Sequence, residues 1–254
     1  MSGDRWAIVR RWIGKPERIG GLCVGLLVVG VTVFAGEHLR ADQDVRVRSQ
    51  MSHLGDMAVQ LARSVVAVHA DGNGSGSGIV LDGTGLVLTN SHVVDRSSRI
   101  TVADSTGTRS YRATRVGTDA LRDVALLKLE SPPGLPVARI DPDARPETGS
   151  AVLAVGYAGG SELPVTATGT LVAVNQSTRS DGEGGRPVSR LTGMLAIDNR
   201  VAPGDSGGGL FDADGRVVGM ITSIDTGNPA PGGASAFAIP IDTAVQVARS
   251  WASW

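Results

Sequence analysis

The chain has 254 residues, a formal net charge of −1 and 41% hydrophobic residues, enough for one sizeable core and an additional segment. No block of basic residues occurs in the expected folded part, so a nucleic-acid-binding module is excluded. The single cysteine, Cys23, excludes an intramolecular disulfide. It lies in an apolar segment, where we expect it to pack, with lipidation as the alternative.

An uncharged segment, residues 19–36, predicts an N-terminal transmembrane helix. Its 18 residues would span roughly 27 Å as a helix, close to the hydrocarbon thickness of a bilayer. Basic residues before it outnumber those shortly after it by five to three, which predicts a cytoplasmic N-terminus (residues 1–18) and an extracytoplasmic remainder. The alternative is a cleaved signal peptide, because Val33 and Ala35 are small residues at positions that a signal peptidase would read.

Residues 37–52 are charged and are interpreted as a linker to a folded domain at residues 53–254. A short amphipathic helix is predicted at residues 51–63, where Leu54, Met57, Ala58 and Leu61 share one face. Short runs rich in Val, Ile and Thr follow, separated by Gly- and Pro-containing turns, which predicts an all-β fold.

The predicted strands form two sets, at about residues 64–131 and 150–240, joined by a Pro- and Gly-containing connection at residues 132–149. Asp214 and Gly215 predict a hairpin turn in the second set. Asp242 would cap a closing C-terminal helix at residues 242–254. The strands are predicted at residues 64–69, 78–81, 86–89, 99–103, 111–116 and 124–129, and then at 151–155, 166–174, 191–197, 209–211, 217–223 and 236–239.

Three motifs carry candidate chemistry: Thr-Asn-Ser-His-Val-Val around His92, Arg-Asp-Val-Ala-Leu-Leu-Lys-Leu around Asp123, and Pro-Gly-Asp-Ser-Gly-Gly around Ser206. A serine hydroxyl is a poor nucleophile unless an imidazole accepts its proton, and the imidazole needs a carboxylate to set its tautomer. The order His, Asp, Ser is the one found on double β-barrels of the chymotrypsin type. These residues therefore predict a catalytic triad on that fold.

The same motifs resemble the HtrA/Deg branch of the trypsin-like serine proteases. The glycine-rich run at residues 74–78, the segment at 196–198 and the closing run Phe-Ala-Ile-Pro at 237–240 also resemble this branch, so the likeness covers about residues 53–250. It implies a chymotrypsin-like double β-barrel. Many members carry a C-terminal PDZ domain, which we do not expect here, because only 14 residues follow Pro240.

The resemblance implies roles for individual residues. Ser206 would be the nucleophile, His92 the general base and Asp123 the orienting carboxylate, while the backbone N–H groups of Gly204 and Ser206 would form the oxyanion hole. Asp205 is assigned no catalytic role. Counting back six residues from the nucleophile places Arg200 at the base of the specificity pocket, which excludes a preference for Lys or Arg at P1. Either Arg200 points away and the pocket, with Thr222, Ser223 and Ile224, takes small aliphatic groups, or it points inward and favours an acidic P1.

No cofactor or metal site is expected, because the histidines lack ligand spacing. The glycine-rich segment 71–78 lacks the Lys-Ser/Thr ending of a phosphate-binding loop and is expected to be a flexible surface turn.

Together these features predict a membrane-anchored extracytoplasmic serine endopeptidase that cleaves exposed or misfolded polypeptides. Two alternatives remain: a catalytically latent binding or sensing module on a protease scaffold, and a hydrolase of small esters. The sequence leaves the oligomeric state open.

Overall fold

The computed structural model describes residues 40, 42–72, 74–131, 134–180, 189–198, 201–222 and 236–254. The chain divides into one unit up to Arg46 and a second from Val47 to Trp254. Residues 42–46 of the first unit are helical. The expected membrane segment, residues 19–36, lies outside the described residues, and no helix in the described part is long and apolar enough to cross a bilayer.

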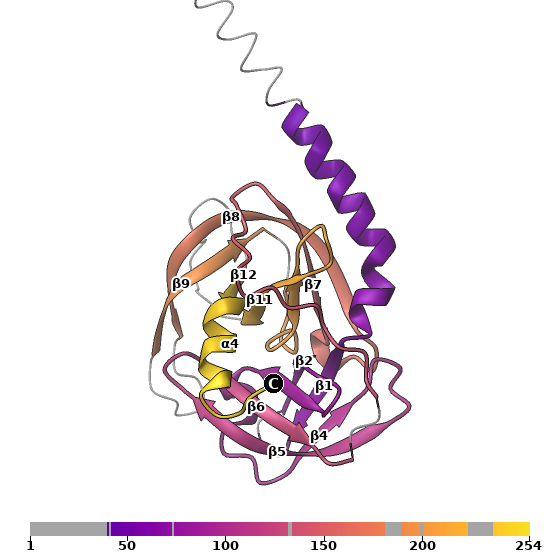
Figure 1. Ribbon diagram of the computed structural model, residues 1–254, viewed down its shortest axis with the longest axis vertical. Coiled ribbons are helices and arrows are strands. Elements are labelled where there is room, and N and C mark those ends of the chain that lie inside the picture. Colours follow the sequence, from indigo (N-terminus) through magenta and orange to yellow (C-terminus); the bar gives the residue numbers. More distant parts are fainter. Residues whose placement is uncertain are drawn as a thin grey trace, which may run out of the picture. The chain divides into compact units, whose positions relative to one another are not determined.

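The first predicted strand set forms a closed barrel in the order β1-β2-β3-β6-β5-β4 (Figure 1). Its interior is filled by Val, Leu, Ile and Ala side chains, among them the buried Val66, Val87 and Leu127. The strands are β1 (Val65–Ala70), β2 (Gly74–Val80), β3 (Leu86–Thr89), β4 (Ile100–Ala103), β5 (Ser110–Asp119) and β6 (Val124–Leu129).

The second set closes in the order β10-β11-β12-β9-β8-β7, so the described residues confirm the predicted double barrel. Its interior contains Val152, Leu171, Leu195 and Ile221, all buried. The strands are β7 (Ala151–Gly156), β8 (Val165–Ser180), β9 (Ser189–Ile197), β10 (Gly209–Phe211), β11 (Val217–Thr222) and β12 (Ala236–Pro240). The predicted turn at Asp214-Gly215 joins β10 to β11, and Gly215 takes a positive φ of 71° there.

Several boundaries differ from the sequence-based prediction. The closing helix ends at Arg249 and not at residue 254, and its N-cap is Pro240, so Asp242 lies in the first turn. β8 continues six residues beyond the predicted end at residue 174, through polar residues that carry no hydrophobic alternation, and it pairs with β9 there. The expected surface turn at residues 71–78 is wrong over its second half, because Gly74–Val80 is β2 and Ser77 is fully buried. Glycine is required here by close packing: a Cβ on Gly76 would lie 2.7 Å from the methyl carbons of Val93.

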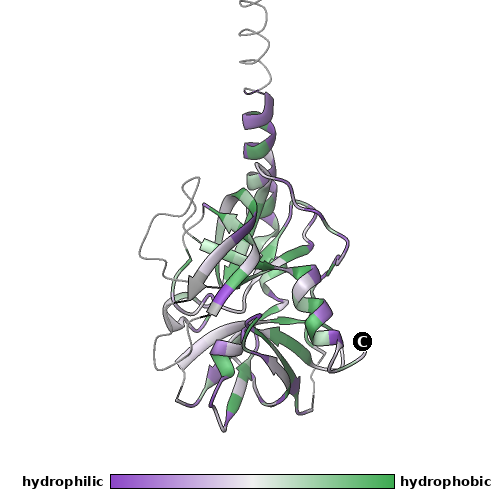
Figure 2. Ribbon diagram, turned by 90° about the vertical axis from the view of Figure 1, so that its left-hand side faces the viewer, coloured by the Kyte–Doolittle hydropathy of each residue, from purple (hydrophilic) through white to green (hydrophobic). Residues whose placement is uncertain are grey.

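Helical segments cover both barrels. Residues 47–62 are helical, so the predicted approach helix begins earlier than residue 51 and includes part of the expected linker. The closing helix, α4 (Ile241–Arg249), contacts β11 and β12 of the second barrel and β6 of the first. Figure 2 shows hydrophobic residues gathered in the barrel strands and in α4. One large hydrophobic cluster includes Leu54 of the first helix, Leu126, Phe211 and Val245 of α4, and so joins all four parts.

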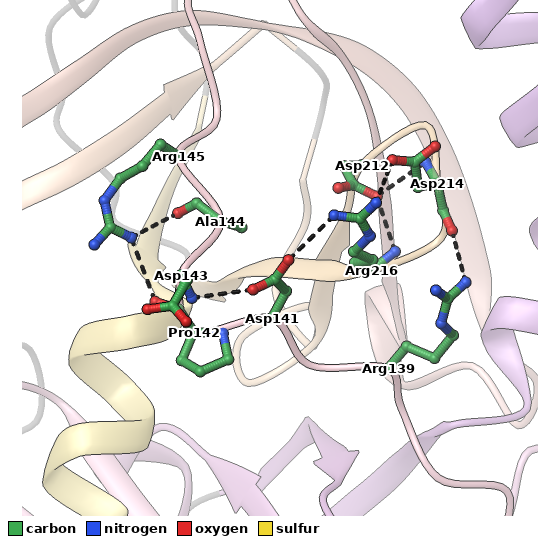
Figure 3. Close-up of polar contacts among 9 residues, drawn as sticks. All are labelled: Arg139, Asp141, Pro142, Asp143, Ala144, Arg145, Asp212, Asp214 and Arg216. Carbon is green, nitrogen blue, oxygen red and sulfur yellow. Dashed lines mark hydrogen bonds and ion pairs between the residues drawn. The ribbon is translucent and has the colours of Figure 1, made fainter.

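The connection between the barrels is fixed to the β10–β11 turn (Figure 3). Val217 N–H donates to the Arg139 carbonyl at 2.8 Å, and Ile140 forms a parallel bridge with Val217. The Arg216 guanidinium contacts Asp141 at 3.1 Å and Asp214 at 2.7 Å. Such exposed ion pairs contribute little energy individually. The backbone bonds and the ion pairs together set the path of the connection.

The packing of the C-terminus on the first barrel is testable at Gly117, which lies at a bulge in β5. A Cβ at this position would fall on the indole ring of Trp251, so we expect Gly117→Ala to lower the free energy of unfolding by about 1–3 kcal/mol. Urea unfolding measures the loss. Gly83→Ala is the matched control, since no atom lies within 4 Å of its added Cβ. Equal losses in the two variants would contradict the packing argument.

Candidate active site

His92 and Asp123 are brought together by the pairing of β3 with β6. Thr89 is the register partner of Ala125, so the residues after β3 and those before β6 lie at the same end of the pair. His92 lies in the single helical turn α3 (Ser91–Val94), which follows β3 directly. Asp123 takes a left-handed backbone conformation with φ of 56°, and the side-chain amide of Asn90 donates to its carbonyl at 3.0 Å. The His92 and Asp123 motifs, which are separate in the sequence, are thus in contact in the fold.

The Asp123 carboxylate is buried and receives hydrogen bonds from several directions. Nδ1 of His92 lies 2.9 Å from Oδ2 and 3.0 Å from Oδ1, and the His92 backbone N–H donates to Oδ1 at 3.1 Å. The Ser91 hydroxyl donates to Oδ1 at 3.3 Å and the Thr222 hydroxyl to Oδ2 at 3.1 Å. A carboxylate facing Nδ1 holds the proton on that nitrogen, which leaves Nε2 as a proton acceptor.

Ser206 lies in the segment before β10, and its backbone is tied to the first barrel. Its carbonyl accepts the N–H of Ser77 at 2.8 Å, and the next amide, Gly207 N–H, donates to the Ile221 carbonyl at 2.8 Å. A Cβ on Gly76 would touch both the Ser206 carbonyl oxygen and the side chain of Val93, the residue after His92. The structure therefore places Ser206 beside the turn that carries His92, at the contact between the barrels.

Gly204 has a φ of 102°, a conformation that favours glycine. A side chain is also excluded by space, because a Cβ would collide with the Tyr157 carbonyl oxygen. The Pro203 carbonyl accepts the Gly159 N–H at 2.6 Å, and the Asp205 carbonyl accepts the Gly208 N–H at 2.9 Å. Both peptide planes that carry the candidate oxyanion donors, Gly204 N–H and Ser206 N–H, are thus fixed by hydrogen bonds.

The remaining predicted site residues have different outcomes. Thr222 was expected to line a substrate pocket, and the structure directs its buried hydroxyl to the Asp123 carboxylate. Arg200, Ser223 and Ile224 lie outside the described residues. Sequence reasoning missed Ser77 and Asn90, whose contacts join segments far apart in the chain. The only local signal was Ser77 within the glycine-rich run.

Asp205 is buried beside the nucleophile, with its carboxylate directed inward. The Ala202 N–H donates to Oδ2 at 2.8 Å. Burial raises the pKa of Asp205 above its usual range, and hydrogen bonds from the backbone amides of Ala202 and Ala158 offset part of this rise. The Asp205 side chain therefore connects the two turns that contain Ala202 and Ala158 beside the nucleophile.

Comparison with known proteins decides the family. Residues 76–220 match the model of the trypsin-like peptidase domain, which is more than half of the chain. The chain belongs to the trypsin-like peptidase family. The matched segment contains the His92, Asp123 and Ser206 motifs.

The chain is homologous to serine proteases of the HtrA/Deg branch, which its motifs resemble. It is 36% identical over 182 residues to a protein named putative serine protease HhoA, from Synechocystis. It is 38% identical over 172 residues to one named probable periplasmic serine endoprotease DegP-like, from Marinomonas. These alignments cover 71% and 68% of this chain but only 43% and 34% of the relatives, so the chain spans about two fifths of their length or less.

A solved structure supports the same assignment. The serine endoprotease from Yersinia pestis superposes with a TM-score of 0.63 and 31% sequence identity. The superposition covers 77% of this chain and 65% of that one.

The surroundings of Asp205 predict how stability depends on pH. Because its pKa is higher in the folded than in the unfolded state, its contribution to stability is present below the ordinary value near 3.8 and is lost as the pH rises through the folded pKa. The free energy of unfolding of the wild type relative to Asp205→Asn should therefore decrease from pH 3.5 towards neutrality. Urea unfolding at several pH values measures this difference.

Asp119 supplies a control of opposite sign. Desolvation raises its pKa, but hydrogen bonds from the backbone and guanidinium of Arg122, its positive charge and the Leu121 amide outweigh burial and hold the pKa below the ordinary value. Its contribution is present above the ordinary value and is lost as the pH falls through the folded pKa. The wild type relative to Asp119→Asn should gain stability as the pH rises. The same slope for both aspartates would contradict the assigned environments.

Proposed function

We propose that this protein is an extracytoplasmic, membrane-anchored serine endopeptidase that cleaves exposed or misfolded polypeptides through an acyl-enzyme. The observation that carries the proposal is the His92–Asp123 contact of 2.9 Å, with the Ser206 segment held beside it. Substrates and cellular role are proposed from the resemblance to HtrA/Deg proteases, two of whose members are described as periplasmic serine endoproteases.

In the proposed reaction Ser206 Oγ attacks the scissile carbonyl while Nε2 of His92 accepts the hydroxyl proton. Asp123 stabilises the imidazolium through Nδ1–H. The negative charge that develops on the carbonyl oxygen is bound by the N–H groups of Gly204 and Ser206. His92 then returns the proton to the leaving amine as the C–N bond breaks, which leaves an ester on Ser206. Water, deprotonated by His92, hydrolyses this ester and restores the free hydroxyl.

The proposed location depends on two observations. The relatives described as periplasmic support a peptidase domain outside the cytoplasm. The apolar segment 19–36 and the larger number of basic residues before it support an anchor with its N-terminus inside.

The triad is tested by substitution and labelling. Ser206→Ala and His92→Ala should each lower kcat by several orders of magnitude, and the double variant should be no worse, because either change removes the activated nucleophile. Asp123→Asn should lower kcat by about 10⁴-fold through the wrong imidazole tautomer. Turnover of resorufin-labelled casein measures all three.

A fluorophosphonate probe provides the direct readout on the full-length chain. The wild type and the control variant Ser250→Ala, altered at an exposed hydroxyl of the last helical turn, should label, and Ser206→Ala should not. Wild-type activity in purified Ser206→Ala would refute the serine mechanism. An unlabelled wild type would favour the latent binding module.

The anchor is tested by fractionation. If residues 19–36 are retained, the full chain should stay with membranes after carbonate washing, and protease added outside should reach the peptidase domain. Ala35→Leu provides the control, because a larger side chain blocks signal-peptidase cleavage and should change nothing in a retained anchor. A released wild-type protein that begins near Gly36 would show a signal peptide instead.

A further inference from the structure

The hydroxyl of Ser77 lies at the contact between the barrels and belongs to β2, a strand that carries none of the proposed triad residues. Ser77 is fully buried. Its hydroxyl donates to the Gly204 carbonyl at 2.7 Å and accepts the Tyr157 N–H at 3.0 Å. Its backbone N–H donates to the Ser206 carbonyl at 2.8 Å. One residue of the first barrel therefore holds two carbonyls of the nucleophile segment in the second.

We propose that Ser77 is a positioning residue that aims the oxyanion-hole amides by fixing the Gly204 carbonyl. The inference rests on the proposed function and adds to it a determinant outside the triad and the oxyanion hole. Ser77 touches no reacting atom in the proposed mechanism. Its effect passes through the backbone from Gly204 to Ser206.

The geometry of a peptide unit links the direction of a carbonyl to that of the amide that follows it. In a trans peptide the C=O and the following N–H point in opposite directions, so a hydrogen bond to the carbonyl also orients the amide. The Pro203 carbonyl, held by Gly159 N–H, orients the Gly204 amide, and the Asp205 carbonyl, held by Gly208 N–H, orients the Ser206 amide. The peptide between these two donors has its carbonyl on Gly204. That carbonyl is the one held by Ser77.

The hydrogen bonds that hold the Pro203 and Gly204 carbonyls belong to a single network. Tyr157, whose amide donates to Ser77 Oγ, immediately precedes the short helical turn η1 (Ala158–Gly160), which supplies the Gly159 amide that holds Pro203. Because Ser77 Oγ accepts from Tyr157, its own proton is directed at Gly204. Ser77 thus ties these two segments together from the first barrel, and Asp205, which accepts from the Ala158 amide, ties them from the second.

Conformational freedom makes this support necessary. Gly204 has no Cβ to restrict its backbone, and its φ of 102° is one of several conformations open to glycine. Oxyanion stabilisation requires donors that are fixed before charge develops. Without the Ser77 hydrogen bond, the Gly204 carbonyl loses a buried partner. Its peptide plane keeps the bond from the Asp205 N–H to the Ala202 carbonyl at 3.0 Å but can turn about it, which misdirects the amide donors on either side.

The decisive variant is Ser77→Ala in the full-length chain. We expect kcat on resorufin-labelled casein to fall on the order of 10- to 100-fold, less than the ~10²–10³-fold lost when one oxyanion donor is deleted outright. KM should stay within about twofold, since the interaction acts in the transition state. The midpoint of the pH–rate profile should be unchanged, because the hydrogen bonds of His92 and Asp123 are untouched.

A transition-state analogue separates positioning from general destabilisation. A peptidyl boronate forms a tetrahedral adduct with Ser206 and places an oxygen in the oxyanion hole, so its inhibition constant should rise by the same factor by which kcat/KM falls. Ser64→Ala is the matched control. Ser64 is also buried and its hydroxyl also donates to a carbonyl, that of Leu61 at 2.8 Å, but this bond lies in the turn before β1. This variant should keep wild-type kcat.

Ser77→Cys keeps the test decisive if Ser77→Ala does not fold. A thiol is a weaker donor of similar shape, so kcat should fall between those of the wild type and the alanine variant. Wild-type kcat in a folded Ser77→Ala, or in Ser77→Cys if the alanine variant is unfolded, would overturn the proposal. A fall in kcat without weaker boronate binding would also overturn it. An inactive, unlabelled wild type would instead refute the proposed function.

Discussion

The site depends on the contact between the two barrels, because neither barrel contains all of it. His92 and Asp123 lie on the first and Ser206 on the second. The contact is held by the hydrophobic cluster that includes Leu126 of β6 and Phe211 of β10. Burial of that apolar surface is the main favourable term, at roughly 25 cal/mol per Å². The polar contacts at the interface add little net energy but determine which atoms face each other.

Close approach of the barrels requires residues without side chains. Gly207 could not carry a Cβ, because it would collide with the Ser77 carbonyl oxygen and the Thr89 hydroxyl, which are themselves hydrogen-bonded at 2.6 Å. Gly208 meets the Val155 carbonyl of its own barrel. Gly207 therefore allows the backbone of one barrel to lie directly on the other. This close packing brings the Ser77 hydroxyl within hydrogen-bonding distance of the Gly204 carbonyl.

Much of this architecture was predictable from sequence because it depends on local patterns. Alternating or continuous apolar runs located the strands of both barrels, and the motif order indicated that His92, Asp123 and Ser206 would meet. The role of Ser77 was not predictable, since it depends on Tyr157 and Gly204, partners that are far away in the sequence. Thr222 was assigned to a pocket for the same reason: its bond to Asp123 crosses between the barrels. The extension of β8 was missed because its polar residues lack hydrophobic alternation.

Two buried aspartates near the nucleophile, Asp123 and Asp205, have different structural roles. Asp123 accepts from hydroxyls, a backbone amide and the His92 ring, so every donor that orients it also orients the imidazole. Asp205 accepts from the backbone amides of Ala202 and of Ala158 in η1, and burial raises its pKa. The Asp123 carboxylate therefore orients the imidazole of His92, whereas the Asp205 carboxyl group orients backbone segments. Because Ser77 and Asp205 hold the same segment from opposite barrels, order in the oxyanion segment requires that both barrels be folded and docked.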